Sequence, residues 1–218
     1  MLSLGFRKQS DTPLRILCLG AHCDDIEIGC GGTILTLLET YRRTTVDWVV
    51  FSSEDQRGAE ARESANMFLK QAGSKNIVIK NFTNSFFPYI AGEIKRYFEE
   101  LKRNVSPDLV FTHYRNDLHQ DHRVISELAW NSFRDHMVLE YEIPKYDGDL
   151  GSPNSFVHLD QLMAEKKISY ILECFRSQRT KQWFDEGTFL AMLRLRGVES
   201  NAPSRYAEAF YCRKSVLI

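Results

Sequence analysis

The sequence predicts an α/β fold in three layers, with a mostly parallel sheet between two layers of helices. Short apolar segments of strand length alternate with longer segments whose apolar residues recur every three or four positions. Four such strand–helix units follow one another, which is the pattern of a parallel sheet covered on both faces. Right-handed connections and the common order of such sheets then predict the strand order 3-2-1-4-5, followed by C-terminal additions.

The individual elements are expected in the following order. Strands are predicted at residues 14–19, 46–52, 76–79 and 108–113. Helices are predicted at residues 33–39, 59–72, 89–104 and 119–133, with Gly73 ending the second and Pro107 following the third. The remainder predicts an edge strand at 138–143, a loop that covers the site as a lid, helices at 160–175 and 188–196, and a closing strand at 207–216. Asp160 is the expected N-cap of the first of these helices, and Gly197 the expected end of the second.

Composition predicts one domain over residues 1–218, because 218 residues with 43% hydrophobic content suit a single core. The formal charge of -1 offers no basic surface for nucleic acid, and no apolar run approaches the roughly 20 residues of a membrane helix, so we expect neither nucleic-acid binding nor membrane insertion. A small-molecule ligand is the better expectation. The 5 cysteines include no CxxC pair, and the chain starts with a short polar segment, which together predict a cytoplasmic protein.

Two polar clusters follow strands that the predicted order makes neighbours. Residues 20–32 read as a loop between the first strand and the first helix, and this loop contains His22, Asp24 and Asp25. The second cluster follows the fourth strand and consists of His113, Asp117, His119, Asp121 and His122. Ligands of open parallel sheets bind at the carboxyl ends of the strands. We therefore expect the two clusters to form one site rather than two unrelated turns.

The first and second clusters together offer the ligands of a catalytic zinc ion. His22, Asp25 and His122 would form a site with two imidazoles and one carboxylate, which leaves a fourth position for water. The same ligands accept Fe²⁺, so either Zn²⁺ or Fe²⁺ is the expected cofactor. Zinc lowers the pKa of its bound water to about 7, which prepares the water for attack on a carbonyl.

The remaining polar residues of the clusters are candidates for proton transfer. Asp24 is the candidate general base that takes the proton of the water. His119 is expected as a protonated imidazole that supports the oxyanion or protonates the leaving amine. Asp121 is expected to orient that imidazole, as carboxylates near metal sites do.

These motifs resemble the PIG-L or LmbE-like family of zinc-dependent N-acetylglucosamine deacetylases. The resemblance rests on His22-Cys23-Asp24-Asp25, on residues 27–33 and on His119-Gln120-Asp121-His122-Arg123. Supporting matches at residues 57–60, 107–110, 177–178 and 206–210 extend it over the chain. It implies a Rossmann-like fold and the ligand, base and histidine–aspartate roles given above. The implied reaction removes an N-acetyl group from an amino sugar of the N-acetylglucosamine type or a conjugate of it.

Three further residues have two interpretations each. Arg57 either contacts a substrate hydroxyl, phosphate or carboxylate, or forms a salt bridge with Glu60. Asp117 either binds sugar hydroxyls or braces its loop. Cys23 stands where the family usually has proline, and it is expected to be a tolerated small residue rather than a zinc ligand. Residues 144–155 and the tail beyond Gly197 are expected to select the substrate or to form subunit contacts of a homo-oligomer.

Three other functions were weighed against this hypothesis. A non-catalytic sugar-binding protein on the same fold is the main alternative, and the complete set of ligands with Asp24 and His119 argues against it. A dinucleotide-binding oxidoreductase is disfavoured because residues 20–32 lack GxGxxG and place carboxylates where a pyrophosphate would lie. A metalloprotease is disfavoured because HExxH is absent.

Overall fold

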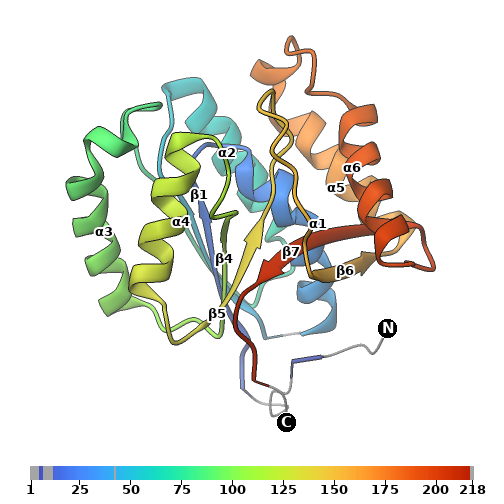
Figure 1. Cartoon of the computed structure of the whole chain (residues 1–218), viewed down its shortest axis with the longest axis horizontal. Coiled ribbons are helices and arrows are strands. Elements are labelled where there is room, and N and C mark those ends of the chain that lie inside the picture. The colour runs from blue at the N-terminus through green and yellow to red at the C-terminus, as the bar shows by residue number, and fades with distance from the viewer. Residues whose placement is uncertain (1–4, 7–11, 42, 217–218) are drawn as a thin grey trace.

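The predicted mostly parallel sheet and its strand order are confirmed by the computed structural model, which describes residues 5–6, 12–41 and 43–216. The sheet of the described chain has seven strands in the order β3-β2-β1-β4-β5-β7-β6 (Figure 1). The parallel strands are β1 (Arg15–Gly20), β2 (Thr45–Val50), β3 (Ser74–Ile79), β4 (Leu109–His113) and β5 (Met137–Tyr141). The strand β7 (Tyr206–Cys212) pairs antiparallel with β5, and β6 (Ser155–Leu159) pairs antiparallel with β7. These two strands are the C-terminal additions to the 3-2-1-4-5 order.

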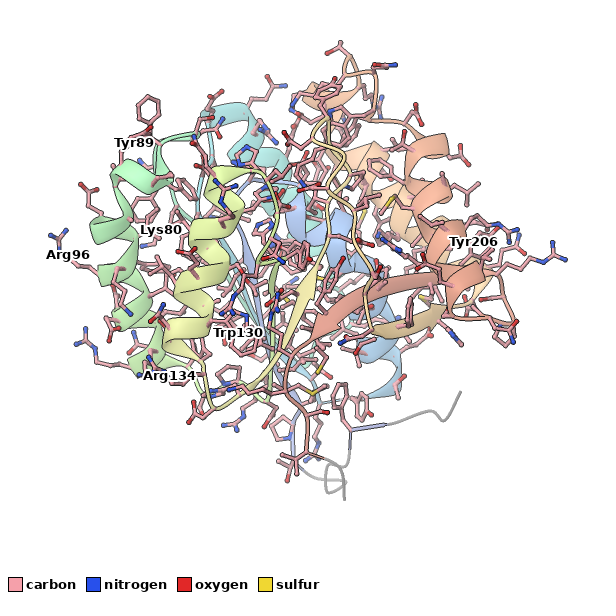
Figure 2. All side chains as sticks on the ribbon, viewed as in Figure 1. Lys80, Tyr89, Arg96, Trp130, Arg134 and Tyr206 are labelled. Atoms are coloured by element: carbon pink, nitrogen blue, oxygen red, sulfur yellow. The ribbon has the colours of Figure 1, made fainter. Side chains whose placement is uncertain are left out.

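Helices cover both faces of the sheet, as predicted. One face carries α3 (Ala91–Asn104) and α4 (Gln120–Ser132), and the other carries α1 (Asp25–Thr40), α2 (Asp55–Phe68), α5 (Gln161–Cys174) and α6 (Glu186–Glu199) (Figure 1). Two short 3-10 helices, η1 (Phe87–Tyr89) and η2 (Arg176–Gln178), lie in the connections. Each face has its own apolar core, since successive residues of β1 alternate between the two clusters of buried side chains. In α3 the expected helical spacing is also seen, with Ile94, Phe98 and Leu101 buried and Arg96 pointing away from the molecule (Figure 2).

The first helix begins earlier than the sequence predicted. Residues 20–32 were expected to be a loop, but α1 starts at Asp25 and includes three glycines of the motif. Glycine normally disfavours a helix interior, and for this reason the sequence pattern predicts a loop here. Here the lack of a side chain allows close packing: a Cβ on Gly29 would lie 2.1 Å from a ring carbon of Tyr141. The next two glycines of the helix are approached in the same way by side chains of α2 and β6.

Other boundaries differ by a few residues, and β6 was not predicted at all. The strand Ser155–Leu159 lacks a strong apolar alternation and is held as a strand by its pairing with β7. The helix α6 continues through Gly197, where a Cβ would lie 2.1 Å from the carbonyl oxygen of Arg205, so this glycine serves close packing rather than helix termination. The expected N-cap Asp160 is confirmed, because its side chain accepts a hydrogen bond from the backbone of Met163.

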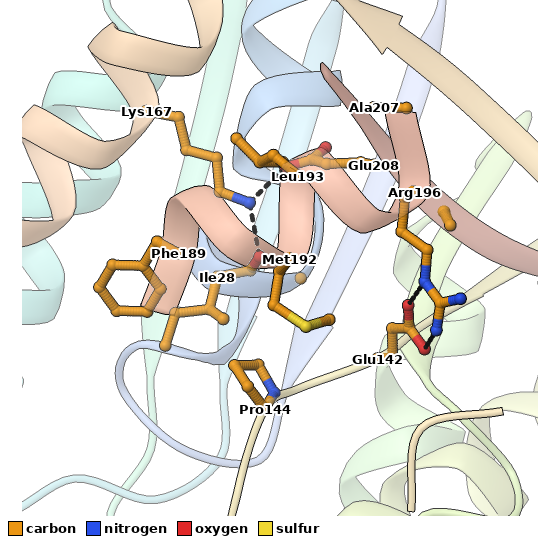
Figure 3. Close-up of a pocket in the computed structure, with 12 residues that line it drawn as sticks. Ile28, Glu142, Pro144, Lys167, Phe189, Met192, Leu193, Arg196, Ala207 and Glu208 are labelled. Carbon is orange, nitrogen blue, oxygen red and sulfur yellow. Dashed lines mark hydrogen bonds and ion pairs between the residues drawn. The ribbon is translucent and has the colours of Figure 1, made fainter. Parts of the chain in front are cut away.

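A buried ion pair contacts the backbone in the middle of α1 (Figure 3). Lys167 Nζ lies 2.6 Å from both the carbonyl oxygen of Ile28 and Oε1 of Glu208. The Glu208 carboxylate in turn accepts from the backbone N–H groups of Gly32 and Thr33, at 2.9 and 2.6 Å. An uninterrupted α-helix would join the Ile28 carbonyl directly to the Gly32 N–H. The ion pair therefore binds α5 and β7 to the backbone of the helix that begins at Asp25.

None of the helices in the described ranges is both long enough and apolar enough to cross a membrane.

Candidate metal centre

The two polar clusters meet at the carboxyl ends of β1 and β4, which are hydrogen-bonded neighbours. His22 follows β1, and Asp25 is the first residue of α1. His122 lies in the first turn of α4, after the loop that follows β4. The predicted adjacency of strands 1 and 4 therefore brings together residues that are far apart in the sequence.

Donor atoms of the three predicted ligands lie close to one another in pairs, and Asp25 faces the two histidines through different carboxylate oxygens. His22 Nδ1 lies 3.1 Å from His122 Nε2 and 3.4 Å from Asp25 Oδ2, and His122 Nε2 lies 3.6 Å from Asp25 Oδ1. Metal–ligand bonds of about 2.0–2.1 Å in a tetrahedral site separate the ligand atoms by about 3.4 Å. The observed separations of 3.1 to 3.6 Å are of this size, so their spacing is compatible with a bound metal ion.

Two overlapping sets of residues have potential ligand atoms within 4.8 Å of one another. One set is His22, His119 and His122, and the other is Asp25, His113 and His122. His122 belongs to both sets. Among the described residues, the two sets divide the three predicted ligands, with His22 in one set and Asp25 in the other, and they add His119 and His113 as further candidates.

Each imidazole donor is held through its other ring nitrogen by a carboxylate. His122 Nδ1 lies 2.9 Å from Asp117 Oδ2, and His22 Nε2 lies 3.3 Å from Asp121 Oδ2. Such partners fix the orientation of a ligating histidine and the position of its proton. The sequence had assigned Asp121 to His119, but the carboxylate contacts His22 instead, because it is also fixed by the backbone N–H groups of residues 85 and 87.

His113 was named in the second cluster but given no role by the sequence. It is the last residue of β4 and is fully buried, and its Nε2 lies 2.9 Å from the Ala21 backbone nitrogen and 3.2 Å from Asp25 Oδ2. Its ring stacks on that of His122, with centroids 3.9 Å apart. The hydroxyl of Tyr141 lies 3.3 Å from the same nitrogen and donates to the Leu19 carbonyl. The position of His113 at the end of a buried strand beside β1 could have indicated from the sequence that it belongs to this site.

The ionisable groups create a local preference for positive charge. Burial opposes protonation of His22, but the carboxylates of Asp25 and Asp121 outweigh it and raise its pKa to about 10. Burial would also raise the pKa of Asp25, but His122, His113 and His22 hold it well below its ordinary value. Burial and the neighbouring His113 lower the pKa of His122 to about 3, so its Nε2 is available as a neutral donor. A cation bound between these residues would offset the negative charge of the Asp25 and Asp121 carboxylates.

Asp24, the candidate base, occupies the N-cap position of α1, where its side chain makes no capping hydrogen bond, and is paired with Arg57. Arg57 Nη2 lies 3.0 Å from Asp24 Oδ1. Burial raises the pKa of Asp24 above its ordinary value, and the Arg57 guanidinium offsets part of that effect. The alternative salt bridge between Arg57 and Glu60 is not what the structure shows, because the Glu60 carboxylate accepts from the backbone and hydroxyl of Ser177.

His119 stands beside both imidazole donors, with ring centroids 4.8 Å from His22 and 4.5 Å from His122. It is the N-cap of α4, and its Nδ1 accepts from the backbone N–H of Asp121 at 3.2 Å. The proton of a neutral ring therefore lies on Nε2. Burial and the positive charge of His22 lower the pKa of His119, which favours this neutral form over the protonated form expected from the sequence.

Asp117 is buried, and both of its oxygens have protein partners. Oδ1 accepts from the His119 backbone N–H at 2.7 Å, and Oδ2 lies 2.9 Å from both His122 Nδ1 and Lys145 Nζ. Burial works against its ionisation, but the hydrogen bond to His122 and the Lys145 ammonium lower its pKa. These contacts favour the bracing role over the alternative role in binding sugar hydroxyls.

Cys23 lies next to the site but does not contribute to it. Its thiol is buried and donates to the Ser52 carbonyl at 3.4 Å. Burial raises its pKa to about 12, so the thiolate that would bind a metal is disfavoured. This agrees with the expectation of a tolerated small residue.

The chain resembles known proteins in sequence and in fold. The profile of the family described as PIG-L, GlcNAc-PI de-N-acetylase, matches residues 17–133. The uncharacterized deacetylase YaiS of Escherichia coli is 26% identical over 145 residues, which cover 59% of this chain and 74% of that protein.

Two solved structures share the fold. The N,N'-diacetylchitobiose deacetylase of Pyrococcus horikoshii matches with a TM-score of 0.65 and 23% identity over 91% of this chain and 83% of that one. GalB, the 4-carboxy-2-hydroxymuconate hydratase of Pseudomonas putida, matches with a TM-score of 0.73 and 18% identity over 94% of this chain and 98% of that one. A deacetylase and a hydratase thus share this fold, so the fold alone does not define the reaction. The family profile, which covers more than half of the sequence, is decisive: the chain belongs to the PIG-L family of GlcNAc-PI de-N-acetylases.

Proposed function

We propose that the protein is a metal-dependent hydrolase that removes the N-acetyl group of an amino sugar or of its conjugate. The observation that carries this proposal is the convergence of His22 Nδ1, Asp25 and His122 Nε2 at separations of 3.1 to 3.6 Å. Two nitrogens and one carboxylate suit zinc, and they also accept ferrous iron. When bound, such an ion acidifies a water molecule and polarises the acetyl carbonyl. The amino-sugar substrate follows from the family and from the chitobiose deacetylase that shares the fold.

Asp24 is the group that takes the proton of the attacking water. It lies one residue before Asp25, is 5% exposed, and has a raised pKa because it is buried. A carboxylate whose pKa is shifted toward neutrality is a better general base than an ordinary aspartate. Arg57 fixes Oδ1 and thereby orients the carboxylate. Arg57 is thus proposed to act on Asp24, and contact with the substrate is its second proposed role.

His119 is the donor for the oxygen of the acetyl group. With Nδ1 bonded to the backbone of Asp121, the neutral ring carries its proton on Nε2, and its centroid lies 4.8 Å from that of His22 and 4.5 Å from that of His122. A fixed neutral donor can stabilise the negative charge that develops on the carbonyl oxygen. As the C–N bond breaks, the amine receives the proton that Asp24 took from the water. Acetate and the free amino sugar are then the two products.

The experiment that tests the proposal combines metal content with acetate release from a panel of N-acetylated amino sugars. The wild type and Asp24→Ala are each expected to hold about one zinc or iron ion per chain, as a single catalytic site does, with acetate released by the wild type alone. A wild-type protein that binds neither metal after both are supplied would refute the metallohydrolase and favour the non-catalytic sugar-binding alternative. Acetate release by Asp24→Ala at the wild-type rate would refute the role of the base.

A further inference from the structure

The connection between β5 and β6, residues 142–154, reaches the metal centre through one lysine. Lys145 Nζ donates to Asp117 Oδ2 at 2.9 Å, to Asp149 Oδ1 at 2.7 Å and to the Ile143 carbonyl at 3.2 Å. An ammonium group has three protons, and these three acceptors use all of them. Lys145 therefore has no donor left for a substrate, and any effect on the site passes through the groups that it holds.

Asp117 is the point where this network meets a metal donor. Its Oδ2 lies 2.9 Å from His122 Nδ1 as well as from the lysine, and the carboxylate is 1% exposed. Its hold on Nδ1 turns Nε2 of the same ring toward Asp25. A carboxylate in this position is held more firmly when a cation also bonds to it, because charge-assisted hydrogen bonds are the strong ones. Lys145 thus supports the orientation of His122 indirectly, through Asp117.

Asp149 makes a second tie, between two loops. Its Oδ1 bonds to Lys145, and its Oδ2 accepts from the backbone N–H of Leu118 at 2.7 Å. Leu118 directly precedes His119 in the sequence. Gly148 has φ of 60°, a left-handed conformation that suits glycine and turns the chain so that Asp149 returns to Lys145. The loop is thereby attached to His122 through Asp117 and to the backbone just before His119.

Arg196 holds the start of the connection and its later part independently of this network. Arg196 bonds through Nε and Nη2 to the buried carboxylate of Glu142, at 2.6 and 2.8 Å (Figure 3). Its Nη2 also donates to the Gly151 carbonyl at 3.2 Å. Between these anchors, Tyr146 is 78% exposed and packs little. The position of residues 145–149 therefore depends mainly on Lys145 and Asp149.

We propose that Lys145 is a positioning residue of the metal centre, and that Lys145 and Asp149 together couple the order of residues 145–149 to metal binding at His122. The proposal rests on the proposed function only for the statement that His122 holds a metal ion. The physical reason is reciprocity: a network that stabilises the metal-binding orientation of His122 is itself stabilised when the metal binds. The loop should then be more ordered with metal than without it.

The test uses zinc as the probe and requires no substrate. Protein stripped of metal is titrated with zinc against a chromophoric chelator, and amide hydrogen exchange is followed in a peptide that spans residues 144–150. Zinc should slow exchange in this peptide of the wild type. Lys145→Met should weaken zinc binding about tenfold, which is the lower end of the effect of removing a residue that supports a metal ligand. It should also abolish the zinc-dependent slowing of hydrogen exchange in this peptide. Lys145→Arg, which keeps the charge, should restore much of both effects, and Lys102→Met on the exposed side of α3 is the matched control.

A second variant separates the two parts of the network and guards against a folding defect. Asp149→Asn leaves Lys145 bonded to Asp117 but weakens the hydrogen bond to the Leu118 backbone. Zinc affinity should therefore stay within about threefold of the wild type, a smaller change than the loss of a ligand's outer partner causes. The zinc-dependent protection of residues 144–150 from hydrogen exchange should fall. Zinc binding by Lys145→Met as tight as that of Lys102→Met would overturn the inference and leave the proposed function intact. Failure of the wild type to bind zinc would overturn both. Equal zinc-dependent protection in the wild type and Asp149→Asn would overturn the role of Asp149.

Discussion

Replacement of Lys167 by methionine is predicted to destabilise the protein strongly. Lys167 and Glu208 are each 3% exposed, and their charged groups lie 2.6 Å apart. The change leaves the Glu208 carboxylate buried without its cation and takes the donor from the Ile28 carbonyl. Breaking a buried pair from one side costs about 3–5 kcal/mol of the free energy of unfolding. For a domain of this size that corresponds to a fall in Tm of about 6–20 °C.

The assay is urea or thermal unfolding of Lys167→Met, with Lys166→Met as the matched control on the same helix. Lys166 lies over the ring of Tyr170, 5.8 Å from its centroid, so its loss should cost about 1 kcal/mol or less. The double variant with Glu208→Gln should be more stable than the sum of the two single losses, since no uncompensated buried charge remains. A loss of less than about 1 kcal/mol of unfolding free energy in Lys167→Met would refute the reasoning. It would mean that the free-energy cost of burying the ammonium group offsets the stabilisation from its hydrogen bonds and ion pair.

Three further predictions concern packing, reactivity and acid stability. Gly29→Ala should cost about 1–3 kcal/mol of unfolding free energy or more, because its Cβ would lie 2.1 Å from the Tyr141 ring. In the control Gly92→Ala the new Cβ meets nothing within 4 Å, so this variant should be neutral or stabilising. A similar Tm for the two variants would contradict the prediction. Cys23 should resist alkylation near neutral pH in the folded protein, since burial raises its pKa to about 12, and rapid labelling detected by mass spectrometry would show otherwise. Although burial opposes its ionisation, hydrogen bonds lower the pKa of Asp121, so its contribution to stability is present above its unfolded pKa and is lost as the pH falls. Between about pH 5 and about pH 2, the metal-free wild type should therefore lose more unfolding free energy than Asp121→Asn. Parallel curves of unfolding free energy against pH for the two proteins would contradict this prediction.

The sheet and the meeting of the two clusters could be predicted because each depends on local, repeated signals. Apolar runs such as Ile16–Leu19 are buried on both faces, and the parallel order follows from the alternation of strands and helices. Once β1 lies beside β4, any polar residue directly after either strand must lie at the same edge. His22, Asp25 and His122 could therefore be grouped from the sequence without any contact being known.

The partners of these residues could not be predicted, because they come from packing rather than from local pattern. Nothing in the sequence around Asp121 indicates that its carboxylate is fixed by the backbone of residues 85 and 87 and so faces His22. Lys145 lies in an irregular loop and meets Asp117 only because β5 runs beside β4. The preference of His119 for the neutral form likewise depends on burial and on the charge of His22, which spacing does not reveal.

The glycine-rich motif shows why local propensity and tertiary packing must be weighed together. Propensity alone keeps Gly31 and Gly32 out of a helix, because each glycine costs about 1 kcal/mol in a helix interior relative to alanine. The folded protein offsets that cost with contacts that only glycine permits, and with the Glu208 carboxylate, which accepts from the backbone of Gly32 and Thr33. These contacts fix the axis of α1, and the start of that axis sets where Asp24 and Asp25 stand. Residues of α5 and β7 thus contribute, through the backbone of α1, to the positions of Asp24 and Asp25.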